Sequence, residues 1–431
     1  MKRLICRVLS IIIALFVIAN CAACSNSTAE LLSSDTSSKP AKSSEMQSSN
    51  SSNASAVVSS NESSKTTGNS SNASSTHTSS ATSSGSKIET SKFHKISSLD
   101  DLLQFANTVR AGYTYAGETV YLEKDIDLSG VEWTPIGNYE KSFNGVFCGN
   151  NHKIKNLKIT SAENATDRHR SNAYVGFFGH VRDGQIKNLI VENVDIRIND
   201  SKNIPYLNVG GIVGYMSGYN KGISISSCKV TGNITIRDTS KAIILVGGML
   251  GGFDANANNT TYNMSTLYSS VDLSVEGYWI EVGGISGIVS TNKEDTTNCN
   301  ISDIIYKGKI NYNGEVSKIG GFGGALSACC YTVIKNCFIS TTLSTEDIEQ
   351  VNSYFGFVFG DESADCRPIT LKNIYANATI NDKNAELLFV GRNNAAVNLE
   401  NCNFVAQLPE DVPFNANKWD LTDLSSPKLK F

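Results

Sequence analysis

The chain has 431 residues and a formal net charge of −4, with 40% hydrophobic and 18% charged residues. No block of like charges indicates a nucleic-acid partner, and no basic amphipathic segment indicates a second contact with a membrane. We therefore expect no nucleic acid among its partners.

Residues 1–24 have the pattern of an export signal. Three basic residues precede an apolar stretch over residues 8–18, which is shorter than the roughly 20 apolar residues of a membrane-spanning helix. The stretch leads to Ala22-Ala23-Cys24, which resembles the lipobox of bacterial lipoproteins, although Cys21 stands where those proteins usually have Leu. The resemblance implies that Cys24 is acylated and that this lipid holds the protein at the extracellular face of the cell membrane. An ordinary secretory signal with incidental cysteines is the alternative.

Residues 25–88 form a tract rich in Ser and Asn. It contains no Phe, Trp or Tyr, so it cannot bury enough apolar surface to offset the entropy of ordering. We predict a disordered linker that separates the anchor from the rest of the protein. The alternative role for this tract is that of a glycosylation target.

A cap module is expected over residues 89–142, beginning with a helix. Apolar residues recur at helical spacing from Leu99 to Val109, Ser97 or Ser98 can cap the start, and Gly112 can end the helix. A short helix at this place would cover the open end of a stack of strands and block edge-to-edge pairing.

Residues 143–408 contain an internal repeat, which determines the predicted fold class. A glycine-rich string recurs about every 36 residues, together with a second string of the form apolar–x–polar–apolar. The clearest glycine strings are Val209–Gly214, Val246–Gly251, Val282–Gly287 and Ile319–Gly324. Alternating apolar and polar residues are typical of strands, and such short units bury their apolar sides only when equivalent strands stack in parallel. We predict an all-β protein, a parallel β-helix (solenoid) of about eight rungs with a short N-terminal capping helix.

In each copy of the second string, we expect the third residue at a corner of the coil and the fourth residue in the core. The corner position holds Asn156, Asn188, Ser227, Thr266, Asp303, Asn336, Asn373 and Asn401. Amides stacked there could hydrogen-bond from rung to rung or to the local backbone. The core position holds Leu or Ile in five copies and Cys228, Cys337 and Cys402 in three, so we predict that these thiols are buried and unreactive. Off this register, in connecting loops where any disulfide is expected, stand Cys299, Cys329, Cys330 and Cys366.

Together these strings resemble the GLUG-motif repeats of bacterial surface proteins. Segments such as Trp133–Gly137 and Phe143–Gly149 resemble the module that commonly precedes the repeats, and residues 409–431 resemble their usual C-terminal cap. The resemblance implies a right-handed parallel β-helix displayed at the cell surface. Some proteins of this kind are adhesins, and others are immunoglobulin-cleaving proteases whose chemistry lies in a separate zinc domain. The mark of that domain would be His-Glu-x-x-His, and none of the 5 His residues is followed by Glu.

A polysaccharide lyase or glycoside hydrolase is an alternative, because parallel β-helices carry both activities. Hydrolysis needs two carboxylates about 5 to 10 Å apart, and Glu294, Asp361 and Asp365 lie in loops of nearby repeats. The stretch Gly179–Asp183 is the nearest match to a polygalacturonase-like string, but the companions expected with it are absent. We therefore expect no enzyme, with no catalytic residue, no metal site and no cofactor.

A binding module is the favoured function. In the segments after the glycine strings, Tyr215, Tyr219, Tyr262 and Tyr331 stand amid Asn, Ser and Gly. Tyrosine offers a flat face to a sugar ring and a hydroxyl for hydrogen bonds, and equivalent loops of a stacked coil emerge on the same side. We predict that these four residues form a strip that binds a glycan or a cell-surface protein, so that the protein is adhesin-like. A passive structural spacer is the remaining alternative.

Overall fold

The structure, a computed structural model, describes residues 95–431 apart from 169–170, 200, 202, 257–259, 292–297, 329, 346–352, 363–367, 382–388 and 393–395. The predicted signal peptide with Cys24 and the predicted linker over residues 25–88 lie outside the described residues. The regular structure is almost wholly β, as predicted. Within the described residues the helices are α2 (Leu99–Ala111) and the single 3-10 turn η1 (Glu163–Ala165).

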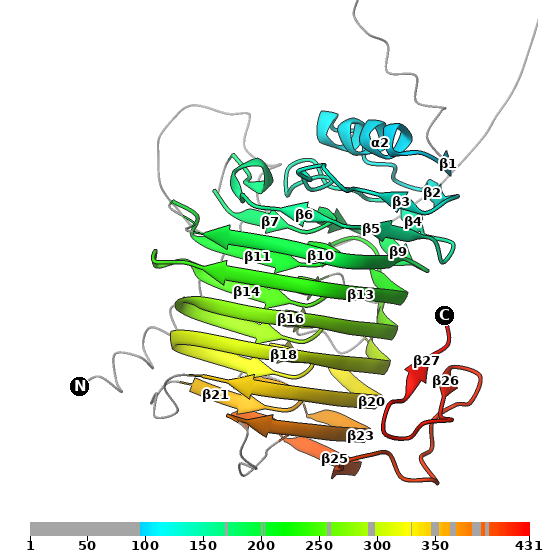
Figure 1. The fold of residues 1–431 in the computed structure, drawn as a ribbon, viewed down its shortest axis with the longest axis vertical. Coiled ribbons are helices and arrows are strands. Elements are labelled where there is room, and N and C mark those ends of the chain that lie inside the picture. Colours follow the sequence, from blue (N-terminus) through cyan, green and yellow to red (C-terminus); the bar gives the residue numbers. More distant parts are fainter. Residues whose placement is uncertain are drawn as a thin grey trace, which may run out of the picture. The chain divides into compact units, whose positions relative to one another are not determined.

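The helix α2 begins and ends close to where the sequence predicts. Ser98 Oγ accepts a hydrogen bond from a backbone N–H of the first turn, and Gly112 ends the helix in the left-handed conformation with a φ of 111°. The apolar face of the helix is buried, and Phe105 packs edge-on against Phe143 and Phe178 of the first turns. The helix lies across the N-terminal end of the coil (Figure 1), which agrees with the predicted capping helix.

The strands form two parallel sheets and one small hairpin. The first sheet has 18 strands, which are β1 (Lys95–Ile96), β2 (Thr119–Leu122), β3 (Ile126–Asp127), β4 (Val146–Cys148), β5 (Lys153–Lys155), β6 (Lys158–Ile159), β7 (Ala173–Val175), β9 (Gln185–Lys187), β10 (Ile190–Asn199), β11 (Tyr206–Gly210), β13 (Ser224–Arg237), β14 (Ile243–Gly247), β16 (Thr261–Gly283), β18 (Asn298–Gly320), β20 (Tyr331–Ser344), β21 (Ser353–Gly356), β23 (Ile369–Ile380) and β25 (Val397–Phe404). The second sheet has seven strands, which are β8 (Phe178–Arg182), β12 (Val213–Gly218), β15 (Leu250–Ala255), β17 (Ser286–Thr291), β19 (Gly323–Ala328), β22 (Phe359–Glu362) and β24 (Val390–Arg392). The antiparallel hairpin joins β26 (Trp419–Asp420) to β27 (Lys428–Leu429).

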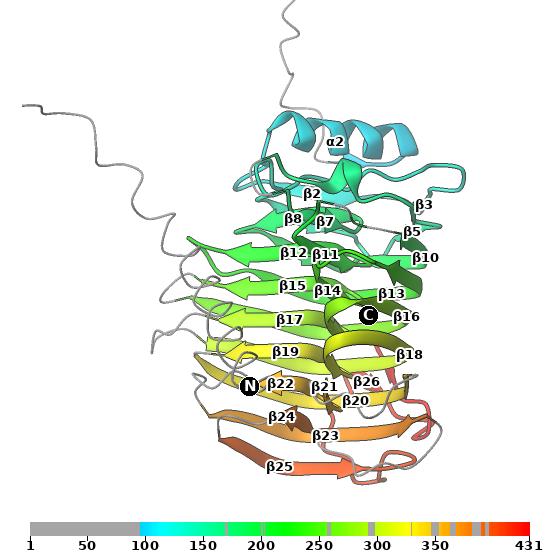
Figure 2. The same ribbon diagram turned by 90° about the vertical axis from the view of Figure 1, so that its left-hand side faces the viewer.

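The chain coils so that it returns to the second sheet once per turn (Figure 2). The seven strands of that sheet mark seven passes of the coil within the described residues, so the predicted number of about eight rungs is approximate. The predicted parallel β-helix is confirmed.

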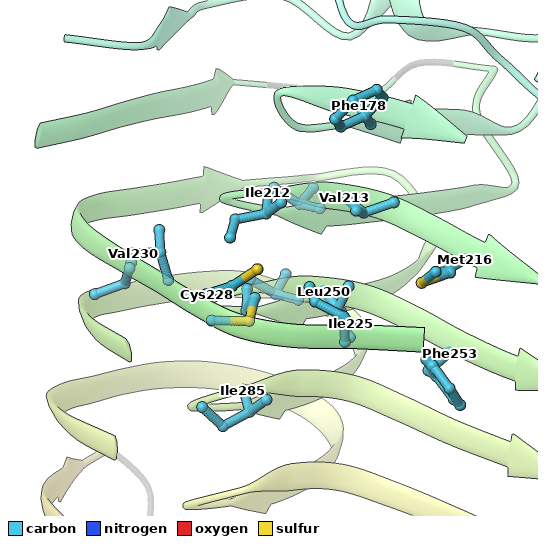
Figure 3. Packing of buried hydrophobic residues seen from close by; sticks show 14 of the residues in the cluster. Phe178, Ile212, Val213, Met216, Ile225, Cys228, Val230, Leu250, Phe253 and Ile285 are labelled. Carbon is cyan, nitrogen blue, oxygen red and sulfur yellow. The ribbon is translucent and has the colours of Figure 1, made fainter. Parts of the chain in front are cut away.

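Apolar ladders make the core of the coil. One ladder runs through Ile186, Ile225, Met264, Ile301, Ile334 and Leu371, which pair in register from turn to turn and have no exposed surface. Burial of a side chain of this size stabilises the fold by about 1.5 to 3 kcal/mol. Figure 3 shows how such side chains fill the interior between successive turns.

Each glycine string turns the chain sharply from the first sheet to the second. A Cβ on Gly247 would lie 2.0 Å from Leu250 O of the same turn, and a Cβ on Gly251 would lie 2.5 Å from Val209 N of the preceding turn. No side chain fits at such distances, so these positions require glycine. The other closing glycines approach the preceding turn in the same way; they are Gly214, Gly287, Gly324 and Gly360. The two sheets therefore meet backbone to backbone at this bend.

The residues at the corner position of the second string all have a left-handed backbone conformation, with φ between 51° and 60°. They are Asn156, Asn188, Ser227, Thr266, Asp303, Asn336, Asn373 and Asn401. Asn and Asp tolerate this conformation best among the non-glycine residues, which accounts for their prevalence. In the C-terminal half, Nδ2 of each amide donates to the turn before it, from Asn401 to Asn373 (3.0 Å), from Asn373 to Asn336 (3.0 Å), and from Asn336 to Asp303 (3.2 Å). The predicted amide ladder is confirmed over these four turns.

The cysteines in the core position behave differently at the end of the coil. Cys228 and Cys337 are buried free thiols, as predicted, and Cys228 lies among the interior side chains in Figure 3. Burial raises the pKa of the Cys228 thiol to about 12, which keeps it in the unreactive neutral form. Cys402 is only half-buried, because β25 is the last strand of its row among the described residues. The prediction of full burial is therefore wrong for Cys402.

The predicted loop position is also wrong for Cys299, whereas it holds for Cys330, which lies in the connection between β19 and β20. Cys299 lies within β18, on the same buried face as Ile301, and Cys330 is buried just before β20. Both are free thiols. Cys329 and Cys366 lie outside the described residues.

The C-terminal segment folds back along the outer face of the coil (Figure 1). It covers Ile305, Phe338 and Tyr375 with its own buried side chains Leu408, Val412, Phe414, Trp419 and Leu429. Lys418 Nζ (2.6 Å) and Trp419 Nε1 (3.1 Å) both donate to the carboxylate of Asp303, the first member of the amide ladder. The residues predicted as a C-terminal cap thus lie against the side of the coil, while β25 at its end is largely exposed.

Candidate functional site

The outer faces of the two sheets meet at the bend made by the glycine strings, and we call this region the inner corner. Two registered rows of side chains line it. The row from the first sheet is Tyr174, Asn208, Leu245, Glu281, Lys318 and Tyr354, and the row from the second sheet is His180, Tyr215, Gly252, Ile288, Ala325 and Asp361. Side chains alternate along a strand, so these residues point away from the core that their neighbours fill. Contacts between the rows bury most of them.

The N-terminal part of the inner corner holds an aromatic cluster, consisting of Tyr139, Tyr174, His180, Tyr215 and Tyr219 around Arg182. The Tyr174 ring lies 5.5 Å from His180 and 6.1 Å from Tyr215, measured between centroids. The His180 and Tyr215 rings stack at 5.9 Å with only 10° between their planes. Tyr139 lies 6.3 Å from Tyr174 and 5.3 Å from His180. Ring contacts of this geometry each contribute about 0.5 to 1.5 kcal/mol beyond area burial, so the cluster is a preformed surface.

Arg182 is the cation of this cluster. Its guanidinium carbon lies 4.7 Å from the centre of the Tyr139 ring and 5.3 Å from that of Tyr219. Nη2 donates to the carbonyl oxygen of Tyr139 at 3.2 Å. The side chain is half-buried, and cation–aromatic pairs strengthen as water is removed.

Asp183 holds Tyr219 in place. Its Oδ1 accepts hydrogen bonds from the backbone N–H groups of Tyr219 (2.7 Å), Asn220 (2.9 Å) and Lys221 (3.2 Å) in the next turn. Although burial alone would raise the pKa of this carboxyl, the hydrogen bonds from Asn220, Tyr219 and Lys221 hold it below its ordinary value. Asp183 is therefore ionised at neutral pH and fixes the loop that sets the Tyr219 ring over Arg182.

His180 is neutral and completely buried. Desolvation, and then the charge of Arg182, hold its pKa well below the usual range. Its Nε2 lies 3.2 Å from Ser217 Oγ, and its Nδ1 has no hydrogen-bond partner among the described residues. Two turns further along the coil lies Asp254. Burial raises the pKa of its carboxyl to about 6, although Tyr215, Asn256 and Ser290 donate hydrogen bonds to it.

These residues do not form a nucleophilic triad. In a Ser-His-Asp triad the carboxylate bonds to Nδ1 of the histidine, whereas Asp254 bonds to Tyr215 and lies in the turn beyond Ser217. His180 and Ser217 also have no exposed surface with which to meet a substrate. His180 and Ser217 form the buried support of the aromatic cluster.

The C-terminal part of the inner corner holds a charged cluster, consisting of Trp279, Glu281, Lys318 and Asp361. Lys318 Nζ lies 2.9 Å from Glu281 Oε1 and 3.2 Å from Asp361 Oδ2, with 16%, 6% and 4% of the three side chains exposed. Burial would lower the pKa of Lys318, but the two carboxylates outweigh it and raise the pKa. Lys318 also lies 5.3 Å from the Trp279 ring. The cation and the two anions of the charged cluster are paired with one another, so this end of the inner corner has a structural role.

The four predicted tyrosines do not form one strip. Tyr215 and Tyr219 belong to the aromatic cluster. Tyr262 has no exposed surface and packs edge-on against Phe253 in the core, so its prediction as a binding residue is wrong. Its side chain faces inward because Tyr262 occupies one of the alternate positions of β16 whose side chains point into the core. Tyr331 is 55% exposed at the start of β20. Two turns of the coil, those that contain Thr261 and Asn298, separate it from the aromatic cluster.

Sequence reasoning missed Tyr139, Tyr174, His180 and Arg182 as site residues. The sequence held a signal for three of them, because they stand on either side of the glycine string Val175–Gly179. Tyr174 precedes its first apolar residue, His180 follows its closing glycine, and Arg182 stands two residues further on. This sequence pattern indicates a site only when the outer faces of the two sheets are known to meet.

Of the acidic residues considered for catalysis, Asp361 is buried in the charged cluster, and Glu294 and Asp365 lie outside the described residues. No group of three or more His, Cys, Asp and Glu side chains able to hold a metal ion occurs in the described part of the chain. None of the described helices is long and apolar enough to cross a membrane.

The comparisons with known proteins bear on the fold. No family model and no curated protein matches the chain. One similar solved structure is a crystal structure described as a "putative immunoglobulin A1 protease" from Bacteroides ovatus. It has 20% sequence identity to this chain and a TM-score of 0.53, and the match covers 79% of this chain and 93% of the other. This likeness shows the β-solenoid fold and says nothing of activity. The GLUG-motif resemblance stays a prediction.

Proposed function

We propose that this protein is a lipid-anchored, adhesin-like binding module of the bacterial cell surface and that its aromatic cluster binds a glycan. The observation that carries the proposal is the gathering of four tyrosines from successive turns, two of which, Tyr139 and Tyr219, lie against one half-buried arginine. Tyr139, Tyr215 and Tyr219 are each partly exposed. Rigid rings beside a cation can stack on a sugar and donate hydrogen bonds to it at little cost in side-chain entropy.

The anchor is proposed from Ala22-Ala23-Cys24 at the end of the apolar stretch. Cys24 is the acylated residue in this proposal, and the linker over residues 25–88 carries the coil away from the membrane surface. Cells labelled with a palmitate analogue should yield labelled protein from wild type and none from Cys24→Ala. Undiminished labelling of the variant would move the anchor to another residue.

The proposed activity is binding without catalysis. The carboxylates beside the cluster are engaged, Asp183 by three backbone N–H groups and Asp254 by Tyr215, Asn256 and Ser290. Neither is placed as the free acid or base that glycoside cleavage needs. A lyase or hydrolase, and a passive spacer, are the competing functions.

A glycan array with purified residues 89–431 tests the proposal. Wild type should bind a subset of glycans, and the double variant Tyr139→Ala/Tyr219→Ala should bind the same glycans at least ten-fold more weakly, since each ring contributes about 1 kcal/mol. Tyr331→Ala is the matched control, because this tyrosine is exposed but outside the cluster. Absence of any glycan binding would favour a spacer or a protein-binding module, and release of reducing sugar would show an enzyme.

A further inference from the structure

The charge of Arg182 is not balanced within the site. Its contacts are one hydrogen bond to the carbonyl oxygen of Tyr139 and the rings of Tyr139 and Tyr219, and no carboxylate of the described residues lies within ion-pair distance of it. Its Nε is buried without a hydrogen-bond partner in the described part of the chain. A half-buried guanidinium without an anion is unusual, because arginine is normally buried only when paired.

The carboxylates nearest in the chain and in register are already engaged. Asp183, the next residue, binds the backbone of residues 219–221 and the side chain of Asn220. Asp254 stands two turns along the row that contains Arg182 and Ser217, and it accepts three hydrogen bonds of its own. Glu140 accepts a hydrogen bond from the backbone N–H of Arg168. None of the three neutralises Arg182.

The charged cluster at the other end of the inner corner shows what a satisfied cation looks like in this fold. Lys318 has two carboxylates within 3.2 Å and an indole ring beside it. Arg182 has the aromatic neighbours and lacks the carboxylates. The difference indicates that the anion for Arg182 comes from outside the protein.

We propose that the aromatic cluster recognises an acidic sugar, with the ligand's carboxylate bound by Arg182 and a sugar ring against Tyr139 or Tyr219. This inference rests on the proposed glycan-binding function and adds the chemical class of the ligand. A guanidinium that lies over aromatic rings keeps its in-plane N–H groups for an acceptor, and its fork matches the two oxygens of a carboxylate.

The test uses three acidic probes with matched neutral partners, measured by titration calorimetry on residues 89–431. The probes are a hyaluronan tetrasaccharide, tri-galacturonate and sialyllactose; the neutral partners are the carboxyl-reduced forms of the first two and lactose. At least one acidic probe should bind at least ten-fold more tightly than its neutral partner. Raising the salt from about 50 to about 500 mM should weaken only the acidic probe, because screening acts on the charge.

Two substitutions assign the effect to Arg182. Arg182→Gln should bring the acidic probe down to the affinity of its neutral partner, and Arg182→Lys should lie between, since an ammonium cannot make the paired contact. Lys229→Gln is the matched control, because Lys229 also lies against a tyrosine, Tyr268, at 5.4 Å but outside the inner corner. It should leave the affinity unchanged. Circular dichroism and melting temperature check that each variant is folded.

The outcomes separate this inference from the proposed function. Equal binding of acidic and neutral probes, lost in Tyr139→Ala/Tyr219→Ala, would overturn the acidic ligand and keep the glycan-binding function. Unchanged preference for the acidic probe in a folded Arg182→Gln would also overturn the inference. Binding of none of the six probes, together with an empty glycan array, would overturn both.

Discussion

The two ends of the inner corner use the same bend of the coil for opposite purposes. At the C-terminal end, Lys318 is buried between Glu281 and Asp361, so its charge is satisfied by neighbouring strands. At the N-terminal end, Arg182 lies between tyrosine rings and has no carboxylate partner among the described residues. The glycine strings create the same close approach of sheets at both ends. The identity of the flanking side chains decides whether the corner stabilises the coil or offers a surface to a ligand.

The largest effect is expected from breaking the charged cluster. Lys318→Met leaves Glu281 and Asp361 buried without a cation, which should lower the free energy of unfolding by about 3 to 5 kcal/mol. Urea unfolding of residues 89–431 measures it. The matched control is Lys372→Met, since the Lys372–Glu400 pair is half exposed, at 50% and 52%, and should cost no more than about 1 kcal/mol. Similar losses in both variants would contradict a structural role special to the charged cluster.

The second prediction concerns the pH dependence of stability beside the aromatic cluster. Asp254 ionises near pH 6 in the folded protein and near pH 4 when unfolded. Its contribution to stability is therefore fully present below about pH 4, falls as the pH rises to about 6, and stays low above that. Asp254→Asn removes this loss, so the variant should be more stable than wild type by about 2 to 3 kcal/mol at neutral pH.

Urea unfolding of wild type and Asp254→Asn at pH values from about 4 to about 7.5 measures this difference. The gap between the two proteins should close toward the acid end of the series. A gap that does not change with pH would show that Asp254 is ionised throughout and that its burial is not the cause.

The smallest effect tests how the aromatic cluster is assembled. Asp183→Asn weakens the hold on residues 219–221, so the Tyr219 ring should leave Arg182 and glycan affinity should fall about five-fold, as expected for loss of about 1 kcal/mol. Because both changes act through one ring, Tyr219→Ala should add little to Asp183→Asn. Asp195→Asn serves as control, since Asp195 pairs with Arg197 on an exposed part of β10. Fully additive losses would contradict the positioning role of Asp183.

The local chemistry of the repeat made much of the fold predictable. The period of about 36 residues decides which residues stack, so the amide corner and the buried Cys228 and Cys337 follow from counting. The helix over residues 99–111 follows from its cap, its apolar spacing and its closing glycine. Each of these features depends on residues within one repeat or at one equivalent position in the next.

The candidate site was only half predictable, because it depends on contacts between different faces. The composition of the segments after the glycine strings pointed to Tyr215 and Tyr219. The same reasoning placed Tyr262 on the surface, whereas it occupies the buried phase of β16 against Phe253. Tyr139, from the module before the repeats, reaches the cluster only because the chain coils around to it.

The sequence by itself determined a parallel coil with its core and its amide corner, because stacking at a constant period buries the apolar residues and repeats the same backbone bend in every turn. The tertiary structure alone decided that the outer faces of two sheets meet at the glycine strings, and that the C-terminal segment folds back onto Asp303. Side chains that alternation assigns to the outside are buried there by residues from other turns and other sheets. Whether such a residue ends up in solvent, in an ion pair or beside a cation without a counterion depends on these long-range neighbours, which no single repeat contains.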